Sequence, residues 1–312
     1  MAKNHKLKTI NYKLITILGP TSSGKSDLAV KLARKFQGEI ISADSRQVYK
    51  GMDIGTGKIT KKEMQGIPHY LLDVASPKRR FSVARYRKIA LKAIDKILKN
   101  RRLPIICGGT GFYIQAVIDG IIIPEVKPDW KLREALEIES AEKLYQKLKK
   151  LDPNRAGIID KKNKRRLIRA LEIVLKTKKP VPVFKTNPLP YPILIIGIKK
   201  SNEKLKKLIK KRLLKRLGQG MVQEIKRLHR EGISWKRLDE FGLEYRWIAR
   251  FLQKKINEQE MVERLQKESE HYAKRQMTWF KRDNRVHWIK NYKEAEKLVK
   301  EFLIESRSTR RR

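Results

Sequence analysis

The chain has 312 residues, 40% of them hydrophobic, and carries 76 Lys and Arg against 33 Asp and Glu, a formal net charge of +43. This composition supports a sizeable buried core and excludes a disordered or collagen-like chain. The single cysteine excludes a disulfide-stapled secreted fold, and no apolar run reaches the roughly 20 residues of a membrane span. We therefore expect a cytoplasmic protein without a membrane segment. The charge favours a nucleic-acid partner, with a generally lysine-rich surface as the alternative.

The first hundred residues alternate short apolar runs with amphipathic stretches. The runs predict strands at 12–18, 39–42, 70–74 and 104–107. A helical spacing of Leu28, Leu32 and Phe36 predicts a helix that ends by Gly38, and a second helix is expected over 83–98. Strands that alternate with helices are typical of a parallel sheet with helices on both faces.

The pattern changes near residue 120. Only helices are predicted over 129–178, followed by a proline-rich stretch, and then come a strand at 191–198, helices over 203–281 and a short apolar run at 286–289. We therefore predict a P-loop-like α/β core with a helical C-terminal part, formed by residues 1–119 and 191–306, and an all-helical insertion at 120–190. Residues 307–312 are expected to be a disordered basic tail.

One glycine-rich segment follows the first predicted strand and opens the first helix. It reads Gly19-Pro20-Thr21-Ser22-Ser23-Gly24-Lys25-Ser26 and fits the pattern G-x-x-x-x-G-K-[ST]. In that setting the loop amides face an anion, Lys25 bridges phosphate oxygens and the Ser26 hydroxyl ligates Mg²⁺. The alternative is an ordinary glycine-rich turn. The loop predicts a nucleotide or another diphosphate-bearing ligand and does not specify ATP.

Two aspartates at or near the ends of predicted strands are candidates for a metal-holding acid. Asp44 comes after the second strand and Asp73 lies within the third. Both can reach the crevice at the carboxyl ends of the strands, where open α/β sheets bind ligands. An ion-paired or capping role is the alternative, and it weighs more for Asp73.

Six ordered blocks make the pattern specific. They are Gly19-Pro-Thr21, the segment from Ile41 to Thr56, Gly66 to Asp73, Cys107-Gly-Gly-Thr-Gly-Phe-Tyr113, Arg165 to Glu172, and Tyr272 to Phe280. Together they resemble the tRNA isopentenyltransferase (IPP transferase) family, the tRNA dimethylallyltransferases, over most of the chain. The resemblance implies transfer of a dimethylallyl group from dimethylallyl diphosphate to the N6 amine of the adenosine just 3′ of a tRNA anticodon, with release of diphosphate.

The resemblance also implies roles for individual residues. Asp44 is the expected general base for the amine, and Lys25, Arg212 and Mg²⁺ near Ser26 are expected to balance the charge on the departing diphosphate. Thr21 steers the diphosphate. The expected tRNA contacts are Asp44, Ser45, Arg46, Gln47, Thr110, Arg165, Arg166, Leu167, Ile168, Arg169 and Arg275. The insertion at 120–190 is therefore expected to bind tRNA, and a solvated Lys/Arg face is the alternative for the segment 165–169. Thr110 is also a candidate helix N-cap, and the spacing of Tyr272, Gln276 and Trp279 favours core packing.

Two stretches depart from the family pattern. Family members commonly have an acidic residue shortly after the arginine that corresponds to Arg212, but here none occurs before Gly220. The segment from Gly242 to Arg246 stands where many members have a glycine motif of different sequence. The alternatives that remain are an adenylate isopentenyltransferase that acts on free nucleotide, a P-loop small-molecule kinase, and an RNA-binding protein without activity. We expect a monomer, since nothing in the sequence suggests a symmetric interface.

Overall fold

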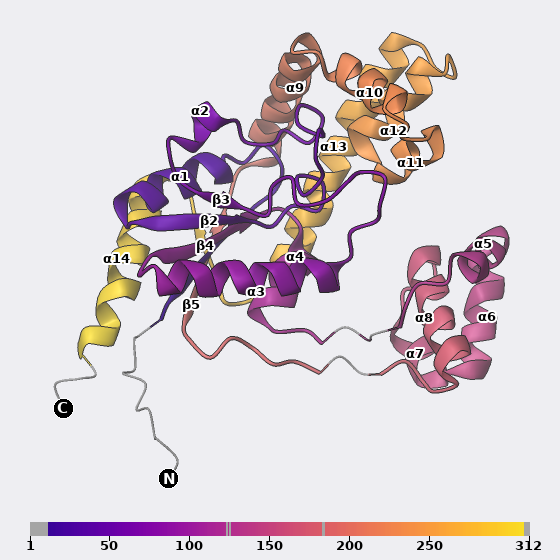
Figure 1. The fold of residues 1–312 in the computed structure, drawn as a ribbon, viewed down its shortest axis with the longest axis horizontal. Coiled ribbons are helices and arrows are strands. Elements are labelled where there is room, and N and C mark those ends of the chain that lie inside the picture. The colour runs from indigo at the N-terminus through magenta and orange to yellow at the C-terminus, as the bar shows by residue number, and fades with distance from the viewer. Residues whose placement is uncertain (1–11, 123, 125, 183–184, 309–312) are drawn as a thin grey trace. The chain divides into compact units, whose positions relative to one another are not determined.

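The computed structural model describes residues 12–122, 124, 126–182 and 185–308 (Figure 1). The chain forms two compact units. The first consists of Met1–Gly120 and Pro188–Arg312, and the second of Ile121–Asn187. The expected insertion at 120–190 and the second unit thus occupy almost the same stretch of chain.

The first unit is built on a six-stranded sheet with the order β3-β2-β4-β1-β5-β6, and every pairing is parallel. The predicted parallel α/β architecture is confirmed. The strands are β1 (Leu14–Leu18), β2 (Gly38–Ser42), β3 (His69–Tyr70), β4 (Leu103–Gly108), β5 (Ile193–Ile198) and β6 (Val286–Ile289). All five residues of β1 are buried, as expected for a strand covered by helices on both faces.

The third strand is much shorter than the sequence predicted. The expected strand 70–74 is wrong beyond Tyr70, because Leu71 and Asp73 adopt left-handed backbone angles, with φ of 66° and 57°. Such angles end a strand. Asp73 then pairs with Lys58 at 2.6 Å. The ion-paired alternative therefore describes Asp73 better than a metal-holding role.

Two hydrophobic cores lie on opposite faces of the sheet. On one face, α1 (Lys25–Lys35) and α14 (Tyr292–Ser308) bury side chains such as Leu32 and Val299. On the other, α3 (Val83–Lys99) and α4 (Gly111–Ile118) contribute Tyr86 and Tyr113, whose rings stack with centroids 4.0 Å apart. Because both faces are covered, the end of the sheet is the place where polar loops can gather.

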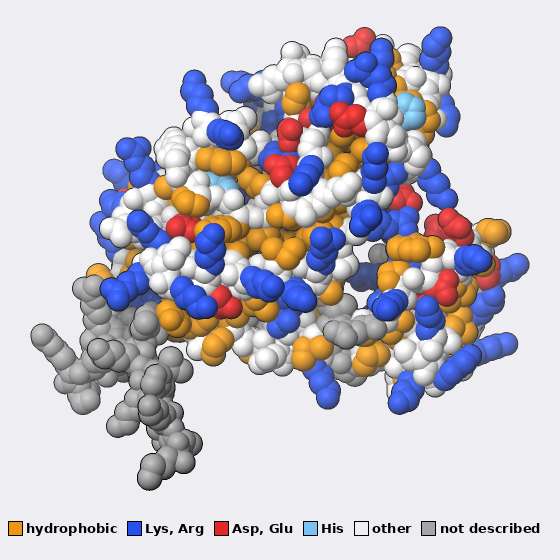
Figure 2. Space-filling model, in the orientation of Figure 1, with side chains coloured by type: hydrophobic (Ala, Val, Ile, Leu, Met, Phe, Trp, Pro, Cys, Tyr) orange, Lys and Arg blue, Asp and Glu red, His pale blue; other side chains and the backbone are white. Residues whose placement is uncertain are grey.

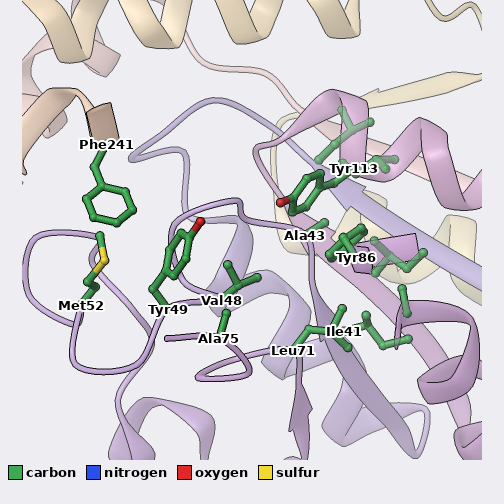
Figure 3. Packing of buried hydrophobic residues seen from close by; sticks show 14 of the residues in the cluster. Ile41, Ala43, Val48, Tyr49, Met52, Leu71, Ala75, Tyr86, Tyr113 and Phe241 are labelled. Atoms are coloured by element: carbon green, nitrogen blue, oxygen red, sulfur yellow. The ribbon is translucent and has the colours of Figure 1, made fainter. Parts of the chain in front are cut away.

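A group of helices from the C-terminal half extends the second core (Figure 1). They are α9 (Asn202–Gly218), α10 (Met221–Arg230), α11 (Trp235–Phe241), α12 (Leu243–Leu252) and α13 (Glu258–Phe280). Figure 3 shows Phe241 of α11 beside Met52 and Tyr49, and the Tyr49 and Phe241 rings meet edge to face at 5.1 Å. This contact joins the helices to the long loop after β2, which also carries the short helix α2 (Lys61–Met64).

The second unit is helical, as predicted. It consists of α5 (Trp130–Ile138), α6 (Ala141–Leu151), α7 (Pro153–Ile158) and α8 (Lys164–Thr177). These helices enclose their own core, to which Leu144, Leu148 and Leu171 contribute fully buried side chains. Arg133 and Arg169 both donate to the fully buried carboxylate of Glu172.

The expected disordered tail needs one correction. Arg307 and Ser308 are the last residues of α14, so the helix continues two residues into the stretch 307–312. Residues 309–312 lie outside the described part of the chain. Among the described helices, none is both long and apolar enough to cross a bilayer.

Candidate active site at the carboxyl end of the sheet

The glycine-rich loop joins β1 to α1 as the sequence predicted. Gly24 is the N-cap of α1 with a φ of 90°, and Ser22 has a φ of 61°. No side chain caps the first turn of α1, so its amides remain available to an anion. The buried Ser23 hydroxyl has no hydrogen-bond partner among the described residues. The loop therefore has the donors of a phosphate cradle.

Lys25 lies between this loop and two other charged groups. Its ammonium donates to the carbonyl oxygen of Pro20 at 3.4 Å. Burial lowers the pKa of Lys25 from 10.5; Cys107 and Asp44 act to raise it, and Arg212 lowers it further. Lys25, Arg212 and Asp44 thus share one electrostatic neighbourhood, and an anion bound there would raise the pKa of Lys25 again.

Asp44 has its two carboxylate oxygens in different roles. Oδ1 accepts hydrogen bonds from the amides of Arg46 at 2.8 Å and Gln47 at 3.3 Å, which fixes the turn after β2. Among the described residues, no hydrogen bond reaches Oδ2. One oxygen thus holds the side chain in place while the other is available to accept a proton.

Thr110 connects this turn to the neighbouring strand. It occupies the N-cap position of α4, but its side chain makes no capping hydrogen bond. Instead its hydroxyl oxygen accepts from the amide of Ser45 at 3.0 Å. Tyr272 of α13 lies close to Thr110, and burial raises the pKa of Tyr272 to about 12. The expected cap is therefore a brace for the segment 44–47.

Gln276 of α13 is a functional residue that the sequence analysis missed. Its side-chain oxygen accepts from the amide of Thr21 at 2.8 Å, and its side-chain nitrogen donates to the carbonyl of Gly109 at 2.8 Å. Gln276 is 6% exposed, so the expected core position is correct, but the residue also ties the phosphate loop to the end of β4. A side chain at Gly109 would collide with it. Arg275 beside it is exposed, with its guanidinium 5.9 Å from the centroid of the Tyr272 ring.

Arg212 of α9 approaches the site from the other side. Its guanidinium donates to the carbonyl of Gly57 at 3.0 Å, and the side chain of Gln47 donates to the same oxygen at 3.3 Å. Burial and the nearby Arg216 lower the pKa of Arg212, against the opposing charges of Glu244 and Asp44. One backbone carbonyl thus positions both a cation expected near diphosphate and a side chain expected near the target base.

The loop that carries Gly57 is held by a second missed residue, Glu224 of α10. Its buried carboxylate accepts from the amides of Asp53, Ile54 and Gly55 at 2.7–3.0 Å, and from the Tyr245 hydroxyl at 2.9 Å. Four donors on one carboxylate make a rigid anchor. No local sequence pattern marks Glu224, because its loop partners lie about 170 residues away.

Arg216, which lies in the stretch without an acidic residue after Arg212, has its acidic partner on another helix. Arg216 pairs with Glu244 of α12 at 2.5 Å and donates to the carbonyl of Gly55 at 2.8 Å. Glu244 belongs to the run 242–246, the second departure from the family pattern. The two departures therefore meet in one ion pair.

Some of the remaining predicted tRNA contacts have exposed side chains, and others have side chains that contact other parts of the protein. Arg46 donates to the carbonyl of Phe241 at 2.9 Å. Arg165 and Arg166 on α8 are exposed. Leu167 and Ile168 are 0% and 4% exposed in the core of the second unit. The expectation that these two side chains bind tRNA is thus corrected to a packing role, because a helix with one buried face turns them inward. Arg169, also expected to contact tRNA, pairs with Glu172.

Comparisons with known proteins support one family. Residues 47–283 match the family model described as IPP transferase. A tRNA dimethylallyltransferase of Acetivibrio thermocellus is 42% identical over 297 residues, which cover 92% of this chain and 95% of that protein. A homologue from Halothermothrix orenii with the same name is 39% identical over 321 residues, covering 97% and 98%.

Solved structures agree. The crystal structure of a full-length tRNA isopentenylpyrophosphate transferase from Bacillus halodurans matches with a TM-score of 0.71 at 35% identity, covering 95% of this chain and 98% of that one. A eukaryotic dimethylallyltransferase described as acting on tRNA matches with a TM-score of 0.76 at 28% identity, covering 94% and 78%.

Proposed function

This chain belongs to the IPP transferase family, and we propose that it transfers a dimethylallyl group from dimethylallyl diphosphate to tRNA. The acceptor is the N6 amine of the adenosine just 3′ of the anticodon, and diphosphate is released. The observation that carries this proposal is the arrangement of Asp44 in the electrostatic neighbourhood of Lys25 and Arg212, with its Oδ1 held by two amides and its Oδ2 without a hydrogen bond from any described residue. A base and two cations are what this displacement needs.

The chemistry assigns one task to each group. The bond between the allylic carbon and the diphosphate oxygen breaks, and its electron pair leaves with the diphosphate. The amides of the phosphate loop, Lys25 and Arg212 stabilise that charge. A bond forms between N6 and the allylic carbon, and the amine proton passes to Oδ2 of Asp44. Gln276 holds the phosphate loop in position through Thr21, and Thr110 holds the segment that carries Asp44 through Ser45.

The hydroxyl oxygen of Ser26 in the loop is also a suitable ligand for Mg²⁺. The Ser26 hydroxyl is exposed in the first turn of α1, and the described residues contain no cluster of three or more acidic, His or Cys side chains that could hold a metal. Mg²⁺ is commonly held by few protein ligands together with substrate phosphates and water. Bound there through Ser26, Mg²⁺ would supply further charge stabilisation to the diphosphate.

The acceptor is proposed to be tRNA because the relatives are named tRNA dimethylallyltransferases and because the chain is strongly basic. Figure 2 shows Lys and Arg side chains spread over the visible face of the molecule, with fewer Asp and Glu. A free nucleotide would need no such surface. We further propose that the chain works as a cytoplasmic monomer.

Incubation with labelled dimethylallyl diphosphate, Mg²⁺ and either undermodified tRNA or AMP tests the proposal. We expect label in the tRNA, and none in the tRNA with the Asp44→Asn variant. Label in AMP alone would favour the adenylate isopentenyltransferase. Phosphate release from ATP without any prenyl transfer would favour a small-molecule kinase.

A further inference from the structure

A basic groove lies outside the site described above, in the first unit. Eight residues line it: Lys50, Val74, Ala75, Ser76, Lys78, Arg79, Arg80 and Arg85. Five of these are Lys or Arg, and none is acidic. A concave surface with one sign of charge concentrates ligands of the opposite charge.

Most of these cations have no acidic partner. Arg80 pairs with Glu240, but within the described part of the chain no carboxylate forms an ion pair with Lys50, Lys78, Arg79 or Arg85. Arg85 instead lies 5.3 Å from the centroid of the Phe81 ring. The groove therefore keeps a surplus of positive charge that the fold does not use.

A second groove shows that this surplus is not simply a result of the high net charge. It is lined by Lys293, Glu296, Lys297, Lys300, Glu301 and Ile304 of α14. There Lys300 pairs with Glu296 at 2.8 Å, and Lys297 approaches Glu301 at 3.9 Å. Lysines on α14 are thus interleaved with carboxylates, whereas the cations of the first groove are not.

The backbone of the groove is held in place from beneath. The Arg237 guanidinium of α11 donates to the carbonyls of Pro77 at 3.0 Å and Arg79 at 3.2 Å, and to the Tyr49 hydroxyl at 3.3 Å. The same hydroxyl accepts from the amide of Phe81 at 3.1 Å. Because the loop is fixed, less conformational entropy is lost when a ligand binds to its exposed Lys and Arg side chains.

The groove is also continuous with the turn that carries Asp44. The amide of Asp73 donates to the carbonyl of Gln47 at 3.3 Å, and the amide of Lys50 donates to the carbonyl of Ala75 at 2.9 Å. The groove wall therefore begins directly beyond the segment 44–47. A chain with repeated negative charge that enters the site at Asp44 can continue along these cations.

We propose that this groove binds the sugar–phosphate backbone of the RNA substrate, as a docking site separate from the predicted contacts at 44–47 and on α8. The inference rests on the proposed function, since that function supplies the RNA. Lys78 and Arg79 contact phosphates and add affinity without reading sequence.

The test measures equilibrium binding of undermodified tRNA at several salt concentrations, with no dimethylallyl diphosphate present. For Lys78→Ala with Arg79→Ala, we expect weaker binding and a shallower dependence of log K on log salt. The slope should fall by about 0.7–0.9 for each phosphate that the variant no longer neutralises. The matched control, Lys297→Ala with Lys300→Ala, removes the same charge from α14 and should leave the slope unchanged.

An exchange variant separates charge from folding. Lys78→Arg with Arg79→Lys keeps both charges and should keep the wild-type slope. An unchanged slope in the alanine pair, or an equal loss in the α14 control, would overturn the proposal. A protein that binds tRNA with the predicted slopes but transfers no dimethylallyl group would contradict the proposed function and leave the groove assignment standing. A wild-type chain that does not bind tRNA would overturn both.

Discussion

The carboxyl end of the sheet and the helical insertion use their basic residues in opposite ways. At the sheet, Arg212 and Arg216 are mostly buried and are held by backbone carbonyls of the loop 51–57. In the insertion, Arg165 and Arg166 are exposed at the start of α8. Further along α8, the buried carboxylate of Glu172 accepts from Arg133 of α5 and from Arg169.

This difference indicates a division of labour. Fixed cations cost little reorganisation when charge develops, which favours catalysis. Exposed cations release counterions when they meet a polyanion, which favours binding. Substitutions in the first region should therefore change turnover, and substitutions in the second should change affinity and its dependence on salt.

The largest effect is expected at Asp44. The Asp44→Asn variant keeps an oxygen that can accept from the amides of Arg46 and Gln47, but it loses the proton acceptor. We expect kcat to fall by about 10²–10⁴-fold, with tRNA affinity nearly unchanged. Steady-state turnover and equilibrium binding check this, and comparable losses in both quantities would mean that Asp44 mainly docks RNA.

Next in size is the anchor at Glu224. In Glu224→Ala, three amides and the Tyr245 hydroxyl lose their acceptor, so the free energy of unfolding should fall by about 4 kcal/mol. Turnover should fall as well, because the loop positions Gly57 against Arg212. Urea unfolding measures the first quantity.

The matched control for Glu224 is Glu231→Ala. Glu231 follows the same helix and pairs with Arg227 at 3.0 Å at the surface, where an ion pair contributes about 0–1 kcal/mol. If the two substitutions lower the free energy of unfolding equally, Glu224 does not anchor the loop.

The insertion should respond to acid through Glu172. Burial opposes ionisation of this carboxyl, but hydrogen bonds from Arg133, the amide of Asp129 and Arg169 lower its pKa below 4.5. A lowered folded-state pKa contributes stability above the unfolded value that is lost as the pH falls through the folded value. The insertion should thus weaken below a pH of about 4.5.

The Glu172→Gln variant tests this pH dependence. It should lack that part of the acid response and be about 3 kcal/mol less stable at neutral pH, the lower end of the range for a broken buried pair, since both guanidinium groups are partly exposed. Hydrogen exchange of α8 peptides, corrected for the intrinsic effect of pH, reports both. If the variant loses stability in acid as the wild type does, the acid response arises from carboxyl groups other than Glu172.

The smallest effect is expected for Arg165→Ala with Arg166→Ala. Both side chains are exposed, so stability should change by less than about 0.5 kcal/mol. Binding of tRNA should weaken, and its salt slope should fall by about 0.7–0.9 for each phosphate left without its cation. An identical slope in the variant and the wild type would make this an ordinary solvated helix face.

The sequence predicted the parts of the molecule that local patterns encode. The apolar run before Gly19 and the phosphate-loop pattern predicted β1 and the start of α1, and the short run 286–289 coincides with β6. Strand length at β3 was mispredicted, because nothing in the residue types reveals the left-handed angles of Leu71 and Asp73.

The braces of the site were beyond the reach of sequence reasoning. Gln276 contacts Thr21 across 255 residues, and Glu224 contacts Asp53 across 171. Such contacts depend on how helices pack, and a polar residue on a buried helix face has the same spacing as a core residue. Leu167 shows the converse, since a motif that resembles a binding segment contains side chains that only pack.

The division of labour is tested most directly by single-turnover transfer of labelled dimethylallyl at increasing tRNA concentration, with both variant proteins in one series. We expect Asp44→Asn to lower the maximal rate and to keep the half-saturating tRNA concentration. We expect Arg165→Ala with Arg166→Ala to raise that concentration and to keep the maximal rate. If both variants change the same parameter, catalysis and docking are not divided between the two regions.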